Sequence, residues 1–328
     1  MSHYSARMSR REWLRALMIV AVVASSAALA QEPFPSKPIR LVVPTVGGTV
    51  DLIARYVAPK LSEAWGQPVV VDTKAGASGN IAAALVAKAP ADGYTILAGY
   101  NPLAISAALH EVLQYDLAAL TPVTLAVSAP QILVVHPGVP AANIREFIAL
   151  AKARNGAMSY ASISPGSASH LTMELFNTRA GIQLVHVPYK GAAPAINDLL
   201  GMHVQAGFFA AANVIQHVKT GQLRALAVTG GKRLTSLPNL PTIVDSGFPM
   251  FDATIWIGFL LPAGTPAPII EKYNREIVRI LRLPDVRVRI EALDFDVIGS
   301  TPEAFGNFIR SEITTWSNVA KKANVRLD

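Results

Sequence analysis

The segment Ile39–Asp51, IRLVVPTVGGTVD, decides how this chain folds. Its first half is a run of aliphatic residues that ends at Pro44, as expected for a strand buried on both faces. Its second half places Gly47 and Gly48 directly before a segment with helical spacing. A buried strand that turns through glycines into a helix predicts an α/β protein whose ligand site lies at the carboxyl ends of the strands.

The rest of the chain repeats this pattern of short apolar runs and longer helical segments. The predicted strands are 69–72, 94–99, 131–136, 158–163, 184–188, 204–209, 223–229 and 255–261, and the predicted helices are 51–65, 143–154, 169–179, 192–200, 266–283 and 301–322. Gly66 is expected to end the first helix, and Thr265 and Thr301 are expected to cap the last two. We therefore expect largely parallel sheets covered by helices on both faces.

No Gly/Ser-rich linker divides this chain of 328 residues, although its length predicts two lobes. Two α/β lobes joined by crossover strands, with the ligand cleft between them, would need no linker. We expect the crossings near 125–130 and 252–257, with the C-terminal helices packed on the first lobe. Lobe I would then comprise residues 31–127 and 252–328, and lobe II residues 128–251.

Residues 1–30 have the composition of an export signal. Arg10 and Arg11 precede an uncharged stretch, Ala16–Ala30, that closes on the small-x-small pattern Ala28-Leu29-Ala30. This stretch is shorter than the roughly 20 residues that a membrane span needs. We expect cleavage near Ala30 and a soluble periplasmic protein, exported by the twin-arginine or the general secretory route.

Composition and motifs argue against several functions. The chain has no cysteine, which excludes disulfides, thiolate metal sites and a cysteine nucleophile. Its net charge is +7, but the basic residues are scattered, which does not indicate nucleic-acid binding. The seven histidines are dispersed, and no nucleophile elbow, P-loop, dinucleotide fingerprint or zinc-protease motif occurs. We expect a binding protein without catalytic residues, metal or cofactor.

Three strand-to-helix junctions have the small, flexible residues of an anion site. They are the glycine loop within Pro44–Asp51, the loop Gly76–Asn80 and the serine-rich loop within Ser162–His170. Free N–H groups at a helix start favour a negative charge, and hydroxyls can donate to a carboxylate. Asp51 is expected to cap its helix, because a carboxylate facing an anion would repel it.

The predicted ligand contacts are all neutral side chains or backbone. They are Thr45, Val46, Gly47, Gly48, Thr49, Ser78, Tyr100, Ser164, Ser167, Ala168 and Ser169. A carboxylate held by neutral donors would bind with moderate affinity and leave easily, which suits a carrier better than an enzyme.

The chain resembles the tripartite tricarboxylate transporter substrate-binding proteins, also called Bug receptors, along nearly its whole length. The matching stretches are Phe34–Pro44, the Gly47-Gly48 loop with Asp51, Gly66–Val71, Gly79–Ile81, Asp92–Thr95, Ser159–Ser162, Ser169–Leu171, His186–Gly191, Gly221–Thr229, Leu237-Pro238, Pro241-Thr242 and Pro262–Pro266. Their order and spacing together are specific.

The resemblance implies a type II periplasmic-binding-protein fold that closes on its ligand. It also implies a small organic carboxylate as ligand, delivery to a membrane permease with one large and one small subunit, and a monomeric receptor. In the family, the loop after the first strand and the serine-rich loop grip the carboxylate, and they correspond to Thr45–Thr49 and Ser164–Ser169.

The chain departs from the family pattern in two places. The first loop is one residue shorter than usual, and Val50 stands where a hydroxyl residue is expected. Phe209-Ala210-Ala211 lacks the acidic or amide residue that often follows this strand. A less polar monocarboxylate is therefore our hypothesis for the ligand.

Two other interpretations compete with this one. A receptor of another transporter class, or a sensor for an amino acid or aromatic acid, could share the fold, although a sensor would need a fused DNA-binding segment. A periplasmic enzyme on a similar scaffold would need a catalytic lysine, base or metal cluster. Lys190 is the one lysine in a suggestive motif, and Pro188–Gly191 is better explained as a strand-to-helix turn.

Overall fold

A computed structural model describes residues 34–109 and 113–325 of the chain. The chain divides into a short unit, Met1–Lys37, and a compact unit, Pro38–Asp328. All secondary structure of the described residues lies in the compact unit. The predicted export signal and its cleavage near Ala30 lie outside the described residues.

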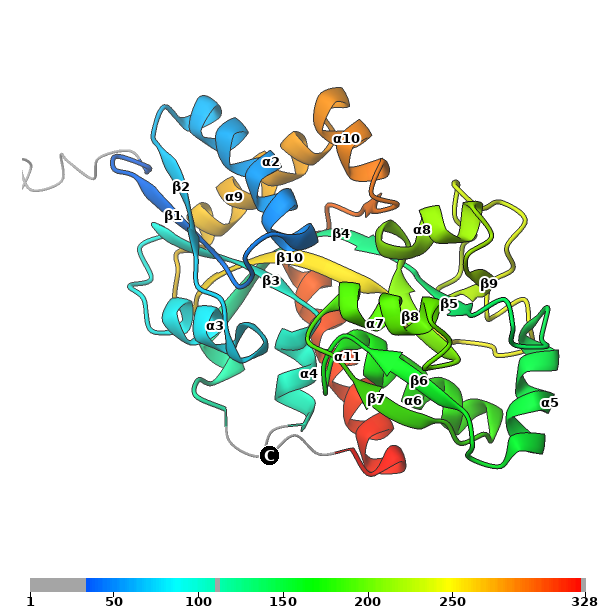
Figure 1. The fold of residues 1–328 in the computed structure, drawn as a ribbon. Coiled ribbons are helices and arrows are strands. Elements are labelled where there is room, and N and C mark those ends of the chain that lie inside the picture. The colour runs from blue at the N-terminus through cyan, green and yellow to red at the C-terminus, as the bar shows by residue number, and fades with distance from the viewer. Residues whose placement is uncertain (1–33, 110–112, 326–328) are drawn as a thin grey trace, which may run out of the picture. The chain divides into compact units, whose positions relative to one another are not determined.

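The compact unit contains two β-sheets (Figure 1). The first sheet has the strand order β11-β4-β10-β3-β1-β2, with β1 Ile39–Val43, β2 Val69–Thr73, β3 Thr95–Tyr100, β4 Leu120–Ala129, β10 Ile255–Pro262 and β11 Asp296–Val297. The second sheet has the order β7-β6-β8-β5-β9, with β5 Gln131–Val135, β6 Ser159–Ser162, β7 Val185–Pro188, β8 Ala206–Ala210 and β9 Arg224–Val228. All nine predicted strands are confirmed within two residues.

The expectation of largely parallel sheets is wrong. β1 is parallel to β2 and β3, and β6 is parallel to β7 and β8. The other pairings in the described part of the chain are antiparallel, and they involve β4, β5, β9, β10 and β11. Four of these strands carry the chain between the sheets, because β4 leads into β5 and the chain returns from β9 to β10. Each sheet therefore has a parallel half, which carries the strand-to-helix junctions.

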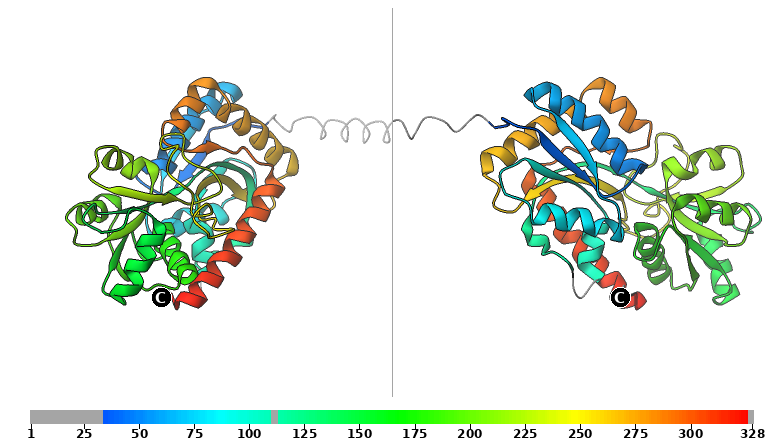
Figure 2. Two further views of the ribbon diagram at one scale, coloured as in Figure 1. Left: turned by 90° about the vertical axis from the view of Figure 1, so that its right-hand side faces the viewer. Right: turned by 60° about the vertical axis from the view of Figure 1, so that its left-hand side comes forward.

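Helices cover both faces of each sheet (Figures 1 and 2). Their bounds are α2 Gly48–Trp65, α3 Asn80–Ala87, α4 Pro102–Leu109, α5 Ile144–Arg154, α6 Ala168–Ala180, α7 Ala192–Leu200, α8 Ala211–Lys219, α9 Ala267–Leu281, α10 Pro284–Glu291 and α11 Pro302–Ala323, with short 3-10 turns η1 Ala77–Gly79 and η2 Leu117–Ala119. In the second sheet, α5 and α6 bury one core against Tyr160 and Phe208, while α7 and α8 bury another against Val134 and Phe209.

Two of the three predicted helix ends are confirmed. Gly66 ends α2 in the left-handed conformation, and Thr301 caps α11 by accepting a hydrogen bond from Ala304 N (3.2 Å). Thr265 does not cap α9. That helix begins at Ala267 after Pro266, and the Thr265 hydroxyl donates instead to Pro262 O (2.7 Å).

The two sheets are connected directly. β4 ends at Ala129, and β5 begins at Gln131 in the other sheet, so only Pro130 separates them. The chain returns through residues 229–254 into β10. The predicted lobe boundaries at 127/128 and 251/252 are close to these connections and stay a prediction. The C-terminal helix α11 packs on α4 and β4, as expected for the first lobe, and also on α6 beside the second sheet.

A buried carboxylate ties α11 to the returning strand. Glu312 Oε2 accepts hydrogen bonds from Trp256 Nε1 and Trp316 Nε1, both at 3.0 Å. Burial raises the pKa of Glu312 to about 7, and the nearby charge of Asp252 acts in the same direction. The ionised form is therefore disfavoured in the folded chain, while the two indole donors limit the shift.

Candidate functional site

The glycine loop after β1 presents bare backbone to its surroundings. Gly47 and Gly48 have φ angles of 68° and 76°, and a Cβ added at either would meet no atom within 4 Å. α2 begins here with no side chain capping its first turn. Thr45 Oγ1 donates to Gly47 O (3.0 Å), which fixes the turn, and Val46 at its tip is 83% exposed. The free amides of the helix start are thus open to an anion.

Asp51 does not cap α2, contrary to the sequence-based expectation. Gly47 holds the cap position, and Asp51 lies in the first turn, buried, with Oδ2 2.9 Å from Arg55 Nε. Its Oδ1 is buried without a hydrogen-bond partner in the structure. Asp51 therefore places a negative charge one helical turn behind the glycine loop.

Ser78 and Tyr100 lie beside the glycine loop. A small cavity is lined by Pro44, Ser78, Gly79 and Tyr100, from the carboxyl ends of β1 and β3 and from η1. A Cβ at Gly79 would come within 2.9 Å of Tyr100 Cε1 and 3.1 Å of Pro44 Cβ, so glycine is needed for this packing. Burial raises the pKa of Tyr100 to about 12, which keeps its hydroxyl a donor, and no described residue hydrogen-bonds to it.

The serine-rich loop after β6 is held together by its own hydroxyls. Ser167 caps α6 by accepting from His170 N (3.4 Å), and its hydroxyl donates to Ser164 O (2.7 Å). Ser169 Oγ is 2.9 Å from Ser167 Oγ and accepts from Ile163 N (3.1 Å). Ser167 and Ser169 are buried, while Ser164 and Ala168 are partly exposed. The capping expected of Ser167 is confirmed; a ligand contact from these hydroxyls stays a prediction.

A stacked histidine pair supports this loop, and the sequence analysis missed it. The rings of His170 and His186 are 3.8 Å apart and 7° from parallel, and Tyr160 stacks on His186 at 5.0 Å. His170 Nδ1 accepts from Gly166 N (3.0 Å), and His186 Nε2 is 2.7 Å from Ser162 Oγ. Burial lowers the pKa of His170 to about 3, with His186 adding to the effect, and lowers that of His186 to about 4. Both rings are therefore neutral at neutral pH.

The turn after β7 brings an exposed lysine next to the serine-rich loop. Gly191 N donates to Ile163 O (2.9 Å), and Tyr189 N donates to Ser162 O (3.0 Å), so the two junctions are directly joined. The Tyr189 hydroxyl donates to Asp198 Oδ2 (2.6 Å), which anchors the turn to α7. Lys190 is exposed and forms no ion pair with any described residue.

The larger cavities lie away from the predicted contacts. One of about 670 Å³ is lined by Thr229–Thr235 and by four acids, Asp252, Glu291, Asp294 and Asp296. Another of about 650 Å³ follows the edge strand β9 and the proline-rich segment 236–241. Neither contains a predicted ligand contact, and the first is lined by the cations Lys232 and Arg233 as well as by its four acids.

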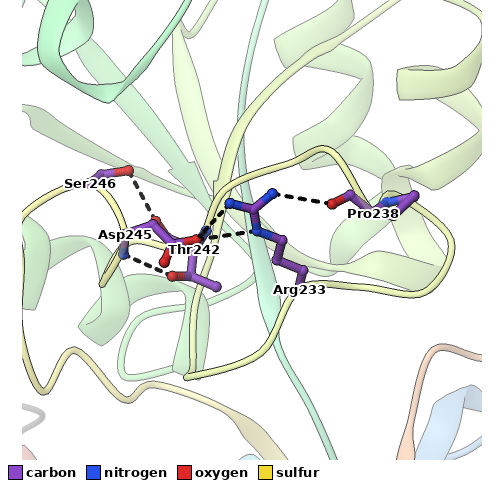
Figure 3. Close-up of polar contacts among 5 residues, drawn as sticks. All are labelled: Arg233, Pro238, Thr242, Asp245 and Ser246. Carbon is purple, nitrogen blue, oxygen red and sulfur yellow. Dashed lines mark hydrogen bonds and ion pairs between the residues drawn. The ribbon is translucent and has the colours of Figure 1, made fainter.

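The connection between β9 and β10 is cross-linked by its own polar groups (Figure 3). Arg233 Nη2 lies 3.1 Å from Asp245 Oδ2, and its Nη1 donates to Pro238 O (3.4 Å). Asp245 N donates to Thr242 Oγ1 (2.9 Å), and the Ser246 hydroxyl donates to Thr242 O (3.0 Å). Arg233 thus has a structural partner, and these contacts hold the segment between β9 and β10 in its fold.

The described residues contain neither a metal-binding cluster nor a membrane-spanning helix. No group of three or more His, Asp or Glu side chains among residues 34–109 and 113–325 is arranged to hold a metal ion. No helix in this described part of the chain is both long and apolar enough to cross a membrane.

The structure therefore gathers the predicted contacts at two sheet edges. Thr45, Val46, Gly47, Gly48, Thr49, Ser78 and Tyr100 lie at the carboxyl ends of β1, β2 and β3, and Ser164, Ser167, Ala168 and Ser169 lie at the carboxyl end of β6. Pro44, Ser78 and Tyr100 share a cavity, whereas none of the cavities above joins the two edges. A single site formed by both loops remains a prediction.

Comparisons with known proteins show what this chain is similar to. A model of the tripartite tricarboxylate transporter family receptor matches residues 53–325. The protein BugT of Bordetella pertussis is 36% identical over 314 residues, which cover 94% of this chain and 96% of BugT.

Two solved structures of Rhodopseudomonas palustris proteins are also similar. Rpa4515 with adipate is 35% identical with a TM-score of 0.79, covering 89% of this chain and 99% of that one. MatC with bound malate is 28% identical with a TM-score of 0.74, covering 87% and 99%. The acids bound in these two structures, adipate and malate, are dicarboxylates.

Proposed function

The chain belongs to the tripartite tricarboxylate transporter receptor family, and we propose that its ligand is a small organic carboxylate gripped by the loops Thr45–Thr49 and Ser164–Ser169. It is a solute-binding receptor with the two-lobed periplasmic-binding fold, and not an enzyme. The observation that supports the proposed site is the open backbone at Gly47 and Gly48, where an uncapped helix begins at a parallel sheet edge.

The two edges offer different donors to a carboxylate. At the first sheet, the amides that start α2 and the hydroxyls of Thr49, Ser78 and Tyr100 can donate, and none of these hydroxyls has a partner among the described residues. At the second sheet, the α6 amides after Ser167 lie at the positive end of the helix dipole. Neutral donors of this kind bind an anion without a buried counter-charge, which favours moderate affinity and release.

Our proposals for the location of the protein and for its partner come from the family to which it belongs. Receptors of this family work in the periplasm, and we propose that the chain is exported by its first thirty residues, cleaved near Ala30 and released as a soluble monomer. We further propose that the loaded receptor docks on a membrane permease with one large and one small subunit.

Thermal unfolding against a panel of carboxylates tests this function. The purified chain is unfolded and refolded first, which removes any ligand retained from the cell, and each acid is compared with its amide. An acid at about 100 times its dissociation constant should add roughly 2.7 kcal/mol to the free energy of unfolding. Stabilisation by one class of acids, and not by their amides, is the expected result. No response to any acid, or equal responses to acids and amides, would contradict it.

A further inference from the structure

The C-terminal helix α11 belongs to two hydrophobic cores. Its first half buries Phe305 and Ile309 in the core of the first sheet, where the ring of Trp256 from β10 lies edge-on to Phe305 at 5.6 Å. Its second half buries Trp316 and Val319 in a core of the second sheet. The helix packs on α4 and β4 and also on α6, and Figure 1 shows it beside both helices. A movement of one sheet against the other therefore acts on the middle of α11.

Glu312 lies at this middle point and joins the two cores. Its Oε2 accepts hydrogen bonds from Nε1 of Trp256, in the first core, and from Nε1 of Trp316, in the second, both at 3.0 Å. Both indole rings are fully buried, and Glu312 is 9% exposed. One carboxyl oxygen thus binds an indole from each core, and β10 is tied to the half of α11 that packs on the second sheet.

The surroundings of Glu312 oppose a negative charge. No lysine, arginine or histidine among the described residues forms an ion pair with it, and both of its hydrogen-bond donors are neutral. Burial and the charge of Asp252 raise the pKa of Glu312 to about 7, while the indole donors limit the rise. A buried charge without a counter-ion is costly, so the ionised form gains free energy by reaching water.

Asp252 is the charged group that acts on Glu312 from outside α11. α4 and β4 carry no titratable side chain, and the charged residues of α9 and the other charged residues of α11 are exposed or partly exposed. On α6, His170 lies in the histidine stack, Glu174 accepts from a tyrosine hydroxyl at 2.5 Å, and Arg179 is exposed. Asp252 lines the cavity of about 670 Å³, whose other charged residues are Lys232, Arg233, Glu291, Asp294 and Asp296.

We propose that Glu312 is a pH-sensitive latch between the two sheets. The neutral carboxyl group holds Trp256 and Trp316 on one oxygen and fixes α11 against β10. Loss of the proton drives the carboxylate toward water, breaks its bonds to the indoles and lets the second half of α11 move with the second sheet. Because the loops Thr45–Thr49 and Ser164–Ser169 lie on different sheets, the latch controls how readily both loops reach one ligand.

Intrinsic fluorescence reports on the latch, because two of the four tryptophans of the chain bind Glu312. Titration of the full chain from about pH 5.5 to about pH 8.5 should show one reversible change in emission with its midpoint near pH 7, as the indoles lose their carboxyl partner. Trp65→Phe, which removes an indole packed on Tyr273, should keep this change.

Three further substitutions assign the change in emission. Glu312→Gln keeps an acceptor for both indoles but cannot ionise, so the change should disappear. Asp252→Asn removes the repelling charge and should move the midpoint to lower pH, by about 0.5 or more. Glu303→Gln, at an exposed acid in the first turn of α11, is the matched control and should leave the midpoint unchanged.

Spin labels measure the mobility that the latch controls. The chain has no cysteine, so Ala64→Cys near the end of α2 and Ala149→Cys on α5 place one label on a helix of each sheet. Both alanines are exposed. The distribution of distances between the labels should be broader at about pH 8 than at about pH 6, and Glu312→Gln should make the two distributions equal.

Each contrary result overturns the latch. A change in emission that persists in Glu312→Gln would assign the proton to another group, and a constant emission would show that Glu312 does not titrate between the two indoles. A change that depends on Glu312 without any difference in label distances would show a local titration that does not control the sheets. These measurements need no ligand, so their failure is distinct from a failure of the proposed carboxylate receptor.

Discussion

The two candidate ligand loops are both rich in small residues, but one is open to its surroundings and the other is largely buried and internally hydrogen-bonded. The glycine loop Thr45–Thr49 has open space over its backbone, one hydroxyl bond within the turn and an exposed valine at its tip. The serine-rich loop Ser164–Ser169 is largely buried, is joined by its own hydroxyls, and rests on the stacked rings of His170 and His186. One loop is adaptable surface, and the other is pre-organised.

This difference teaches that serine content alone does not measure how many donors a loop offers. The hydroxyls of Ser167 and Ser169 are engaged in internal bonds, so their first contribution is the shape of the loop. A rigid loop loses little conformational entropy when it binds an anion, which favours affinity. The open glycine loop can then adapt to the rest of the ligand.

The largest expected effect comes from removing a stacked ring. His170→Ala should lower the free energy of unfolding by about 3 kcal/mol, because it opens a buried cavity and leaves Gly166 N without its acceptor. Chemical denaturation measures this loss. His217→Ala, at a partly exposed histidine on α8, is the control and should change stability by less than about 0.5 kcal/mol. Equal losses in both variants would contradict the supporting role of the stack.

Acidification should weaken the same stack. The folded-state pKa values of His170 and His186 lie below the usual 6.5, so the unfolded chain binds more protons and stability falls as pH decreases from about 6.5 toward 4. The loss should be on the order of 2 kcal/mol between pH 6.5 and pH 5.

The raised pKa of Glu312 changes the free energy of unfolding with pH in the opposite direction, and it provides a check on this prediction. Its pKa is raised to about 7, so its contribution to stability decreases as pH rises from 4.5 to 7. Denaturation at several pH values should therefore show a steeper acid loss in Glu312→Gln than in the unmodified chain. A shallower loss in this variant would contradict the assignment of the two opposing groups.

Ser167→Ala distinguishes the two loops directly. Loss of the α6 cap should lower the free energy of unfolding by about 1–2 kcal/mol and weaken ligand binding. Thr45→Ala removes a single turn bond in the glycine loop and should cost about 0.5 kcal/mol or less. If ligand affinity were unchanged in Ser167→Ala, the serine-rich loop would not belong to the site.

At Gly47 in the glycine loop, the effect that distinguishes a substitution from its control is expected in ligand binding. Gly47→Ala places a Cβ at φ 68° and ψ −167°, a region that essentially only glycine populates, and should cost about 1–3 kcal/mol. Gly156→Ala is a matched control, because Gly156 also has positive φ (81°) and open space around it. Both variants should lose stability, and Gly47→Ala alone should lose affinity. Equal affinities would show that the ligand does not approach Gly47.

Much of the fold could be predicted from local pattern, because buried aliphatic runs such as Ile39–Val43 and Gln131–Val135 depend on their own composition. Strand direction could not, because β5 and β10 pair with strands that are distant in the sequence, β8 and β3. Short helices without a strong apolar period, such as α10, were also missed. These depend on tertiary packing.

The loops of the candidate site could be predicted from the sequence, but the side chains packed against those loops could not. Gly47, Gly48 and Ser167 carry local signals, namely glycine before a helix and a capping hydroxyl. The pairing of His170 with His186 depends on β6 and β7 lying side by side and parallel, which sixteen residues of separation do not reveal. Asp51 was misplaced because the helix begins three residues earlier than its pattern indicates.

A crystal structure of the chain with the acid that binds most tightly in the panel tests the central claim most directly. The account predicts one bound carboxylate with its oxygens about 3 Å from donors of the Ser164–Ser169 loop, and Gly47 and Gly48 in contact with the same molecule. An acid bound instead in the cavity lined by Thr229–Thr235 and Asp296, with both loops unoccupied, would contradict it.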